Sequence, residues 1–230
     1  QSGAENTMKE LILDETLLTS PPDLSTYTKL ERLSISGITK NGALTSLPDI
    51  SALVNLKFLD ISRHPGITSI PAGYFQTNVN LVEIIMKQNG ITAFPDGLFD
   101  KCVKLIKLDF ENNKIQSFPL SISSDDGSKN RLILRQLQTL NLRNNKIVVD
   151  ETTPLSPRYF EELPTLQNLH LEFNKIKFVS KTAFTNQLRL KILGAEGQGN
   201  GFTRVTVCPQ QYYATSVFIP SASLTYYACD

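Results

Sequence analysis

The stretch of sequence that decides the fold is Leu105-Ile-Lys-Leu108-Asp-Phe110-Glu-Asn-Asn113-Lys-Ile115. Counted from Leu105 as position 0, apolar residues stand at positions 0, 3, 5 and 10, and an asparagine stands at position 8. The same pattern recurs in Leu81/Ile84/Met86/Asn89/Ile91, Leu137/Leu140/Leu142/Asn145/Ile147 and Leu166/Leu169/Leu171/Asn174/Ile176. Such self-similarity predicts an array of stacked structural units, each of which packs mainly against its neighbours.

Four further units keep only part of the pattern. They begin at Met8, Leu30, Leu56 and Leu190, so that the starts lie 22 to 32 residues apart along the chain. We therefore expect one domain over residues 1–230, with about eight turns over 8–201 and a capping tail over 202–230. Thr203 to Cys208 alternates in polarity and predicts a final strand in that tail. Two insertions, 121–130 and 148–157, are expected to be surface loops.

Each unit has a readable internal geometry. Positions 2 to 6 predict a short strand that pairs in parallel with the same strand of the next unit, so positions 3 and 5 point inward and positions 2, 4 and 6 outward. After the strand the backbone must turn inside the core, which leaves its donors and acceptors without water. A buried asparagine can satisfy several of them, so we expect a ladder of Asn89, Asn113, Asn145 and Asn174.

The return path of each unit carries an aromatic signature. Phe75, Phe99, Phe160 and Phe184 each precede the next unit's first leucine by six residues, and proline followed by polar residues stands before three of them. Proline in that place suits a short helical turn. The whole pattern resembles the leucine-rich repeat family, in its extracellular class with repeats of roughly 24 residues. The resemblance implies an α/β solenoid: a curved horseshoe with a parallel concave sheet and short helical turns or loops on the convex side.

Composition excludes several classes of function. The net charge is +1, from 23 basic and 22 acidic residues, whereas a nucleic-acid-binding protein needs a concentrated basic surface. No apolar stretch approaches the roughly 18–20 residues that cross a bilayer, so we expect no membrane insertion within this chain. The chain begins at Gln1 without a leader pattern, which suggests a processed product or an excised fragment. The pattern leaves the oligomeric state open.

The three cysteines have different interpretations. Cys102 follows Phe99 by three residues, in a slot that another unit fills with leucine, and is expected to be a buried thiol. Cys208 and Cys229 lie in the tail, where a disulfide would close a loop of about 20 residues, worth roughly 3 kcal/mol. Such a disulfide favours an extracellular or cell-surface location, or the periplasm of a bacterium. A four-cysteine cap, frequent in the extracellular family, is reduced here to two cysteines.

The outward strand positions and the residue after them form the candidate binding surface. Two columns of it run along the stack, one through Asp60, Ile85, Asp109, Asn141 and His170, the other through Ser62, Lys87, Glu111, Arg143 and Glu172. Aromatic and aliphatic anchors inside a polar rim suit a protein ligand. The alternatives are a solvated ladder of paired charges and ordinary scattered apolar residues. The full candidate set is Phe58, Asp60, Ile85, Lys87, Asp109, Glu111, Asn141, Arg143, His170, Glu172 and Phe173.

Position 9 offers a second candidate surface. Lys114, Lys146 and Lys175 repeat there and are expected to line one rim, where a row of like charges could hold an anionic glycan. The alternative is that this position only tolerates solvated lysine.

Catalytic and metal-binding patterns are missing from the sequence. The two histidines, His64 and His170, fall four turns apart and cannot share a metal, and no C-x-x-C or G-x-S-x-G occurs. We therefore expect no cofactor, no metal and no enzymatic activity. The leading hypothesis is a secreted or cell-surface module that binds a protein through its concave face. Alternatives are a glycan or cell-surface adhesin, an enzyme inhibitor or recognition fragment of a larger protein, and a structural spacer.

Overall fold

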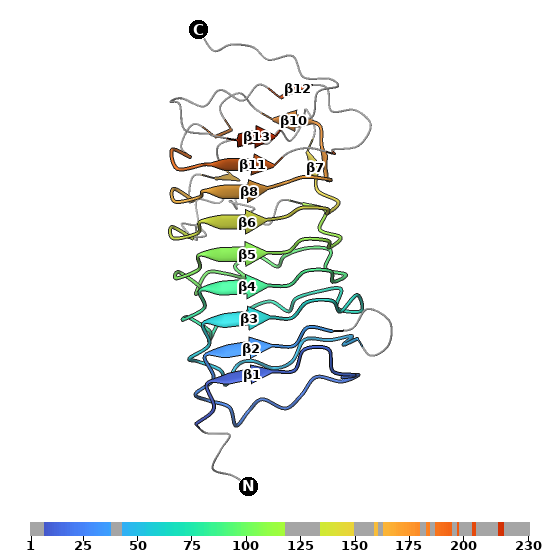
Figure 1. The fold of residues 1–230 in the computed structure, drawn as a ribbon, viewed down its shortest axis with the longest axis vertical. Helices are drawn as coiled ribbons and strands as arrows, with labels where there is room; N and C mark the ends of the chain where they lie inside the picture. Colours follow the sequence, from blue (N-terminus) through green and yellow to red (C-terminus); the bar gives the residue numbers. More distant parts are fainter. Residues whose placement is uncertain are drawn as a thin grey trace.

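The structure is a computed structural model in which short parallel strands stack into an elongated body, with the chain running from the bottom to the top of Figure 1. It describes residues 7–37, 43–117, 134–149, 159–160, 163–179, 183–184, 187–194, 197, 204–205 and 216–218. Within these residues, no helix has the length and apolar character needed to span a membrane.

The main sheet has nine strands, and every described pairing in it is parallel. Equivalent positions of successive units lie opposite each other, as with Leu108 between Ile84 and Leu140. The prediction of a parallel-strand solenoid is therefore confirmed. The strands, in sheet order, are β1 (Glu10–Ile12), β2 (Arg32–Ser34), β3 (Phe58–Asp60), β4 (Glu83–Ile85), β5 (Lys107–Asp109), β6 (Thr139–Asn141), β8 (Asn168–His170), β11 (Ile192–Gly194) and β13 (Ser216–Phe218).

The core is a continuous apolar column behind this sheet. Leu108 and Phe110, at positions 3 and 5 of their unit, are both 1% exposed, and the equivalent residues of the neighbouring units are buried as well. Each such side chain contributes roughly 1.5–3 kcal/mol when it leaves water. Phe75 and Phe99 stack behind them with ring centroids 5.7 Å apart. The inward periodicity of the sequence thus becomes one shared core.

The four ladder asparagines lie where the chain leaves the sheet. Asn113 is typical: its Oδ1 accepts a hydrogen bond from the Ile91 N–H at 3.2 Å, and its Nδ2 donates to the carbonyls of Met86 and Phe110 at 2.8 and 3.0 Å. Asn89, Asn145 and Asn174 make the same kinds of bond in their own turns. Because the bonds to Ile91 and Met86, and their equivalents in the other turns, join neighbouring units, the ladder fixes the register of the stack.

His64 occupies the ladder position in the unit that begins at Leu56. Its imidazole is 1% exposed. Nδ1 accepts the Leu44 N–H at 3.1 Å, and Nε2 donates to the Ile35 carbonyl at 2.7 Å. The partners fix the tautomer, because a backbone N–H can only donate and a carbonyl can only accept. Neutral histidine thus reproduces the acceptor and donor of the asparagine amide.

The residue just before the ladder position has a left-handed backbone in most units. Its φ lies between 52° and 63° at six non-glycine residues, a conformation that costs a side-chain-bearing residue roughly 1 kcal/mol. The recurrence shows that the tight exit from the sheet requires it. These residues are Glu15, Arg63, Gln88, Asn112, Asn144 and Phe173.

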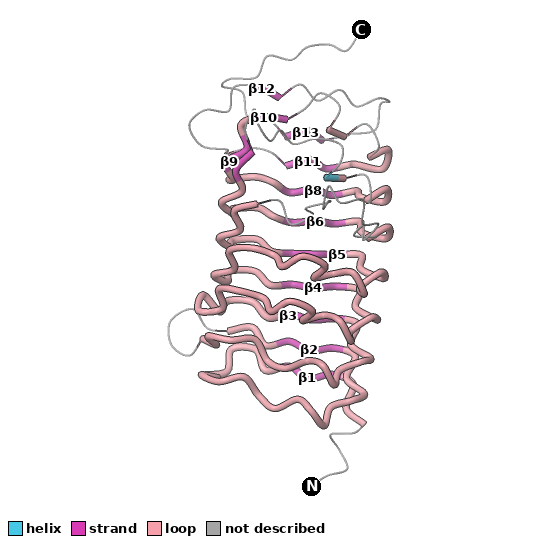
Figure 2. The backbone as a smooth tube through the Cα atoms, turned by 180° about the vertical axis from the view of Figure 1, so that it is seen from behind, coloured by secondary structure: helices cyan, strands magenta, loops and turns pink. Residues whose placement is uncertain are grey.

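The predicted helical turns on the far side of the solenoid are not confirmed. Figure 2 views this side, where loops and turns predominate, and of the described residues only Tyr159 is helical. Glycine explains the difference, because Gly73 and Gly97 adopt φ values of 71° and 67°, opposite in sign to a helix. The Tyr74 N–H then bonds the Pro71 carbonyl at 3.2 Å, which closes a tight turn. A run of such turns replaces the helix.

Two further pairs of strands flank the main sheet. β7 (Val148–Val149) pairs with β9 (Lys175–Ile176), and β10 (Phe178–Val179) pairs with β12 (Arg204–Val205). The start of the second insertion is therefore a strand rather than a loop. The expected tail strand is present as β12, but it pairs with β10, and the main sheet is instead extended by β13. Cys208, Cys229 and the first insertion lie outside the described residues.

Candidate functional site

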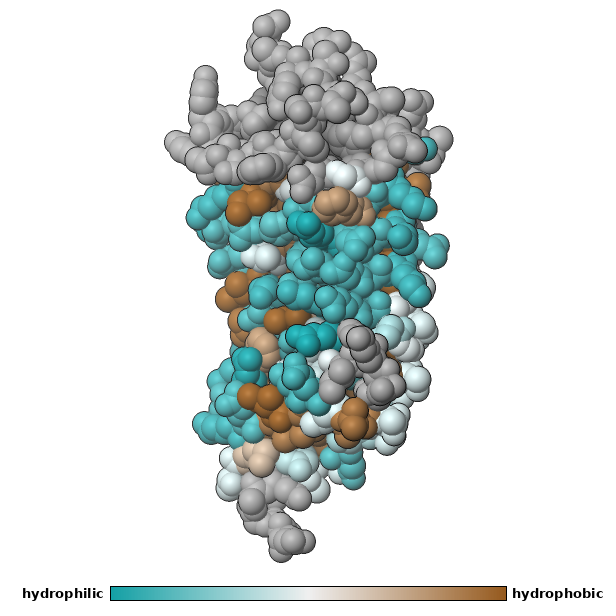
Figure 3. Space-filling model, turned by 45° about the vertical axis from the view of Figure 1, so that its right-hand side comes forward, coloured by the Kyte–Doolittle hydropathy of each residue, from teal (hydrophilic) through white to brown (hydrophobic). Residues whose placement is uncertain are grey.

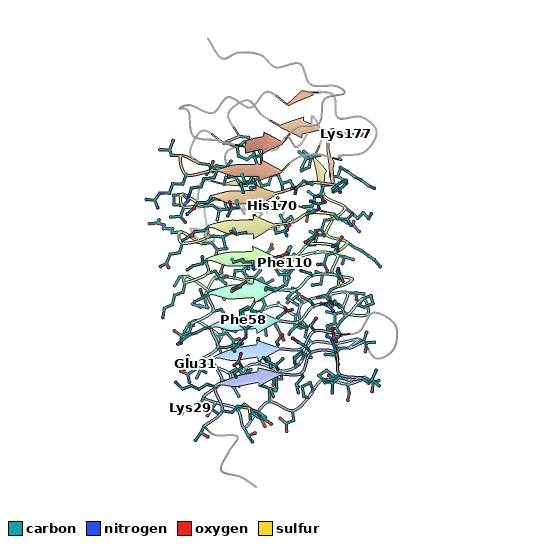
Figure 4. The ribbon with its side chains drawn as sticks, viewed as in Figure 1. Lys29, Glu31, Phe58, Phe110, His170 and Lys177 are labelled. Atoms are coloured by element: carbon teal, nitrogen blue, oxygen red, sulfur yellow. The ribbon has the colours of Figure 1, made fainter. Side chains whose placement is uncertain are left out.

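The candidate binding residues lie together on one surface, which we call the sheet face. It consists of the side chains at positions 2, 4 and 6 of each turn, together with Phe173. Figure 1 looks onto this surface, and Figure 4 shows Phe58 on β3 and His170 on β8. Consecutive strands are about 4.8 Å apart, so side chains of successive turns come within contact distance.

The apolar residues of the sheet face are only partly available. Phe58 and Ile85 are half-buried, and the guanidinium of Arg32 lies 3.5 Å from the centroid of the Phe58 ring. Phe173 is 42% exposed, with the guanidinium of Arg143 at 4.8 Å from its ring centroid. Two arginines thus cover the two aromatic rings by cation–π contact.

The central charges of the sheet face pair between turns. Lys87 Nζ lies 3.1 Å from Asp109 Oδ2, and Asp109 is 3% exposed. Burial by itself would lower the pKa of Lys87, but the neighbouring Asp109 carboxylate reverses this and raises it. The pair crosses from one column to the other. The sequence pattern predicts pairing within a column, so it does not predict the pair between Lys87 and Asp109.

The next turns continue the pattern of paired charges. Arg143 Nε lies 3.8 Å from Glu111 Oε1, and Asn141 Nδ2 donates to Glu111 Oε2 at 3.4 Å. The side chain of Arg143 therefore contacts a carboxylate and an aromatic ring at once, which restricts its freedom. The interpretation of these charges as a paired ladder and their interpretation as a binding surface are both compatible with this geometry.

His170 and Glu172 form the most buried polar pair of the sheet face. His170 Nδ1 lies 3.1 Å from Glu172 Oε1, and this hydrogen bond raises the pKa of His170. Burial would raise the pKa of Glu172, but the hydrogen bonds from His170 and the backbone, together with the nearby charge of Arg143, lower it. Gly194 of β11 makes the space, because a Cβ there would stand 1.9 Å from Glu172 Oε1. The pair is therefore held by a hydrogen bond and built into the fold.

Two carboxylate oxygens on the sheet face have no hydrogen-bond partner within the described part of the chain. They are Oδ1 of Asp60 and Oε2 of Glu172. Burial raises the pKa of Asp60. The sequence gives no direct sign of either unpaired oxygen, since it shows only that acidic residues occupy these positions.

The lysine rim lies apart from the sheet face. Lys114, Lys146 and Lys175 are exposed and make no ion pair with other described residues. Their backbone N–H groups bond the preceding turn at 2.9 Å, so the three lysines follow one another along the stack. Figure 3 views this side of the molecule, where hydrophilic residues cover much of the surface.

The described residues show neither a cluster of metal ligands nor an activated cysteine. Among them, no three His, Cys, Asp or Glu side chains come close enough to hold a metal ion. Cys102 is buried, its Sγ lies 3.9 Å from the Phe75 carbonyl, and burial raises its thiol pKa to about 12. A thiol with that pKa is not a nucleophile at neutral pH.

An unpredicted apolar row marks the edge of the sheet where the strands begin. Val54, Val79 and Val103 are 46%, 43% and 49% exposed and recur at the same place in three consecutive units. They stand two residues before the first leucine of a unit. A repeat alignment can find the row, but exposure becomes visible only in the structure.

Comparison with known proteins supports the repeat assignment. The Leucine Rich Repeat family matches residues 136–163. No curated protein matches the sequence. Among solved structures, the chain is similar to one titled "Crystal structure of TLR13-ssRNA13 complex", with a TM-score of 0.60 and 24% identity over 86% of this chain. The match spans 30% of that chain. At this level of identity the likeness shows the fold alone.

Proposed function

The chain is a leucine-rich repeat protein, and from this premise we propose that it is a non-catalytic module that binds a protein through its sheet face. The fold is commonly protein-binding, and no catalytic family matches. The observation that carries the proposal is the gathering of half-buried Phe58 and Ile85, exposed Phe173 and many charged side chains on one regular surface. Fold alone does not determine function, so the argument rests on that surface.

The sheet face has the properties of a preorganised binding surface. Hydrogen bonds and ion pairs already hold Lys87, Arg143 and His170 in place. A partner that docks there loses little free energy to the ordering of these side chains. Phe58 and Ile85 supply half-buried apolar anchors near the centre of a charged surround.

A photo-crosslinking comparison tests the proposal. A benzoylphenylalanine is placed at Phe58 or Ile85 on the sheet face, and at exposed Thr77 or Lys101 on the convex turns as the matched control. We expect one protein to crosslink from the face positions alone and to be displaced by unlabelled chain. Crosslinking from the convex positions alone would contradict the proposal.

We propose that the protein acts outside the cytoplasm, as a secreted or cell-surface protein. This rests on the resemblance to extracellular repeats and on the disulfide predicted from the sequence between Cys208 and Cys229. Intact mass before and after reduction, with thiol alkylation, tests it on natively expressed protein. One alkylated thiol before reduction and three after would support the proposal, and three at both stages would contradict it.

The lysine rim favours a second candidate function, the binding of an anionic glycan. Three exposed lysines in a row attract a polyanion, and such binding weakens steeply with salt. Replacement of Lys114, Lys146 and Lys175 by glutamine would abolish binding to heparin in this case. The sheet-face interaction would be unchanged.

A further inference from the structure

The sheet face is acidic although the chain is not. Its described residues at positions 2, 4 and 6 carry seven carboxylates and four basic side chains, a net charge of about −3 against +1 for the whole chain. The carboxylates are Glu10, Asp14, Asp60, Glu83, Asp109, Glu111 and Glu172, and the basic residues are Arg32, Lys87, Lys107 and Arg143. A surface of this charge attracts a basic partner and repels an acidic one.

Within that acidic surface, Asp60 and Glu172 have unused hydrogen-bonding capacity. An ionised carboxylate can accept about four hydrogen bonds, and a buried carboxylate oxygen without a partner destabilises the fold. Glu172 is 6% exposed, and its Oε2 has no partner among the described residues. Asp60 is partly buried, and its Oδ1 also has no partner among the described residues. By contrast, Glu10, Glu83, Asp109 and Glu111 each form an ion pair with a basic residue of the sheet face.

Glu172 can take an external donor without losing His170. Oε1 of Glu172 bonds His170, whereas Oε2 is buried and has no partner among the described residues, so an arriving donor can bond Oε2 while the His170 bond is kept. Gly194 leaves the carboxylate room, since no side chain stands there. A guanidinium or ammonium group is the matching donor, because it supplies charge and N–H groups together. The next residue after Glu172, Phe173, is 42% exposed, although the Arg143 guanidinium already lies over its ring.

We propose that the sheet face binds a protein segment with two basic side chains, one received by Asp60 on β3 and the other by Glu172 just after β8. This deepens the proposed function and rests on it. β3 and β8 are four strand spacings apart in the sheet, which corresponds to about 19 Å at about 4.8 Å per spacing. An extended peptide advances about 3.3 Å per residue, so basic residues six positions apart span that distance.

The test uses short Gly/Ser peptides and the isotope-labelled full chain, observed by NMR. The first peptide carries two arginines six positions apart, the second carries them two positions apart, and in the third citrulline replaces both. We expect the first to shift the amides around Asp60 and Glu172 together. It should bind at least about fivefold more tightly than the second, because only the first reaches both carboxylates. Citrulline keeps the shape and loses the charge, so the third should not bind.

Isosteric variants show whether each of the two carboxylates receives a basic side chain of the peptide. Glu172→Gln should remove the shifts around β8 and leave those around β3, and Asp60→Asn should do the reverse. Glu10→Gln is the matched control, since it removes one negative charge from the same face where the carboxylate already pairs with Arg32 at 3.0 Å. It should weaken binding less than twofold. Thermal unfolding of each variant identifies any that fails to fold, and the peptide series on the wild-type chain does not depend on them.

Several results would overturn the inference. They are equal shifts from the citrulline peptide, equal affinity for both arginine spacings, or shifts confined to the lysine rim. The photo-crosslinking result stays separate, because it depends on proximity and not on charge. A protein that crosslinks from Phe58 while the arginine peptides fail would leave the proposed function standing and remove only the basic-segment inference.

Discussion

Mild acid should destabilise the protein through His64. The imidazole is neutral in the folded ladder, because Nδ1 must accept the Leu44 N–H. Burial lowers its pKa below the ordinary value of 6.5, outweighing the bond to the Ile35 carbonyl, which raises it. The unfolded chain therefore binds a proton below pH 6.5 that the folded chain does not, so stability falls as pH falls.

The size of the effect has an upper limit from linkage. One proton bound only by the unfolded state changes the free energy of unfolding by about 1.4 kcal/mol per pH unit. Between pH 6.5 and pH 5, the loss from His64 is therefore at most about 2 kcal/mol. Asp60 acts in the opposite direction, since burial raises its pKa and its contribution to stability therefore grows as pH falls.

The variant His64→Asn isolates the contribution of His64 to the pH dependence of stability, because asparagine is the residue at this position in four other units. Urea unfolding of the wild-type and variant chains is measured between pH 5 and pH 8. The variant should lose less stability than the wild type below pH 6.5. An NMR titration should place the pKa of His64 below 6.5. Identical acid dependence in the two chains, or a His64 pKa at or above 6.5, would refute the reasoning.

Three other perturbations have defined outcomes. His170 affects the pH dependence of stability with the opposite sign, because Glu172 raises its pKa. The stabilisation by His170 is complete below pH 6.5 and declines as pH rises through the folded pKa. Gly194→Ala should displace Glu172 and so lower the His170 pKa measured by NMR. Asn113→Ala should lower the free energy of unfolding by about 3 kcal/mol in urea titrations, since it leaves a buried backbone N–H unpaired. Cys102 should react with a thiol reagent at pH 8 only after unfolding, in mass spectra of the labelled peptide, because burial raises its pKa to about 12.

The repeat pattern predicts the solenoid well because one physical rule recurs in every unit. Alternation along a strand decides which residues are buried, and stacking decides that equivalent residues meet. Leu105 to Ile115 contains both rules within eleven residues. The ladder follows from the same logic, since the turn after the strand has buried donors that only a polar side chain can satisfy.

The details that the sequence does not predict depend on which groups meet in three dimensions and on which local backbone conformation forms. His64 stands in for asparagine, and only the positions of the Leu44 N–H and the Ile35 carbonyl show that an imidazole fits. The helical turns give way to tight turns because Gly73 and Gly97 adopt left-handed backbones.

The candidate site is the least predictable part of the molecule. Lys87 could have paired with Glu111 of its own column, and it selects Asp109 of the other column because distance and burial favour that carboxylate. The space that Gly194 leaves for Glu172 is visible only when the two strands are paired. The sequence predicts which residues share the sheet face and that Glu111 and Arg143 of one column can pair, but it does not predict the pair between columns.

The central claim is that the sheet face binds a protein, and the affinity of the crosslinked partner tests it most directly. The measurement compares the wild-type chain with Phe58→Ala/Ile85→Ala on the sheet face and Thr77→Ala/Lys101→Ala on the convex turns. The face variant should bind at least about tenfold more weakly, since central apolar anchors dominate protein interfaces. The convex variant should match the wild type. A face variant that binds within twofold of the wild type would contradict the account.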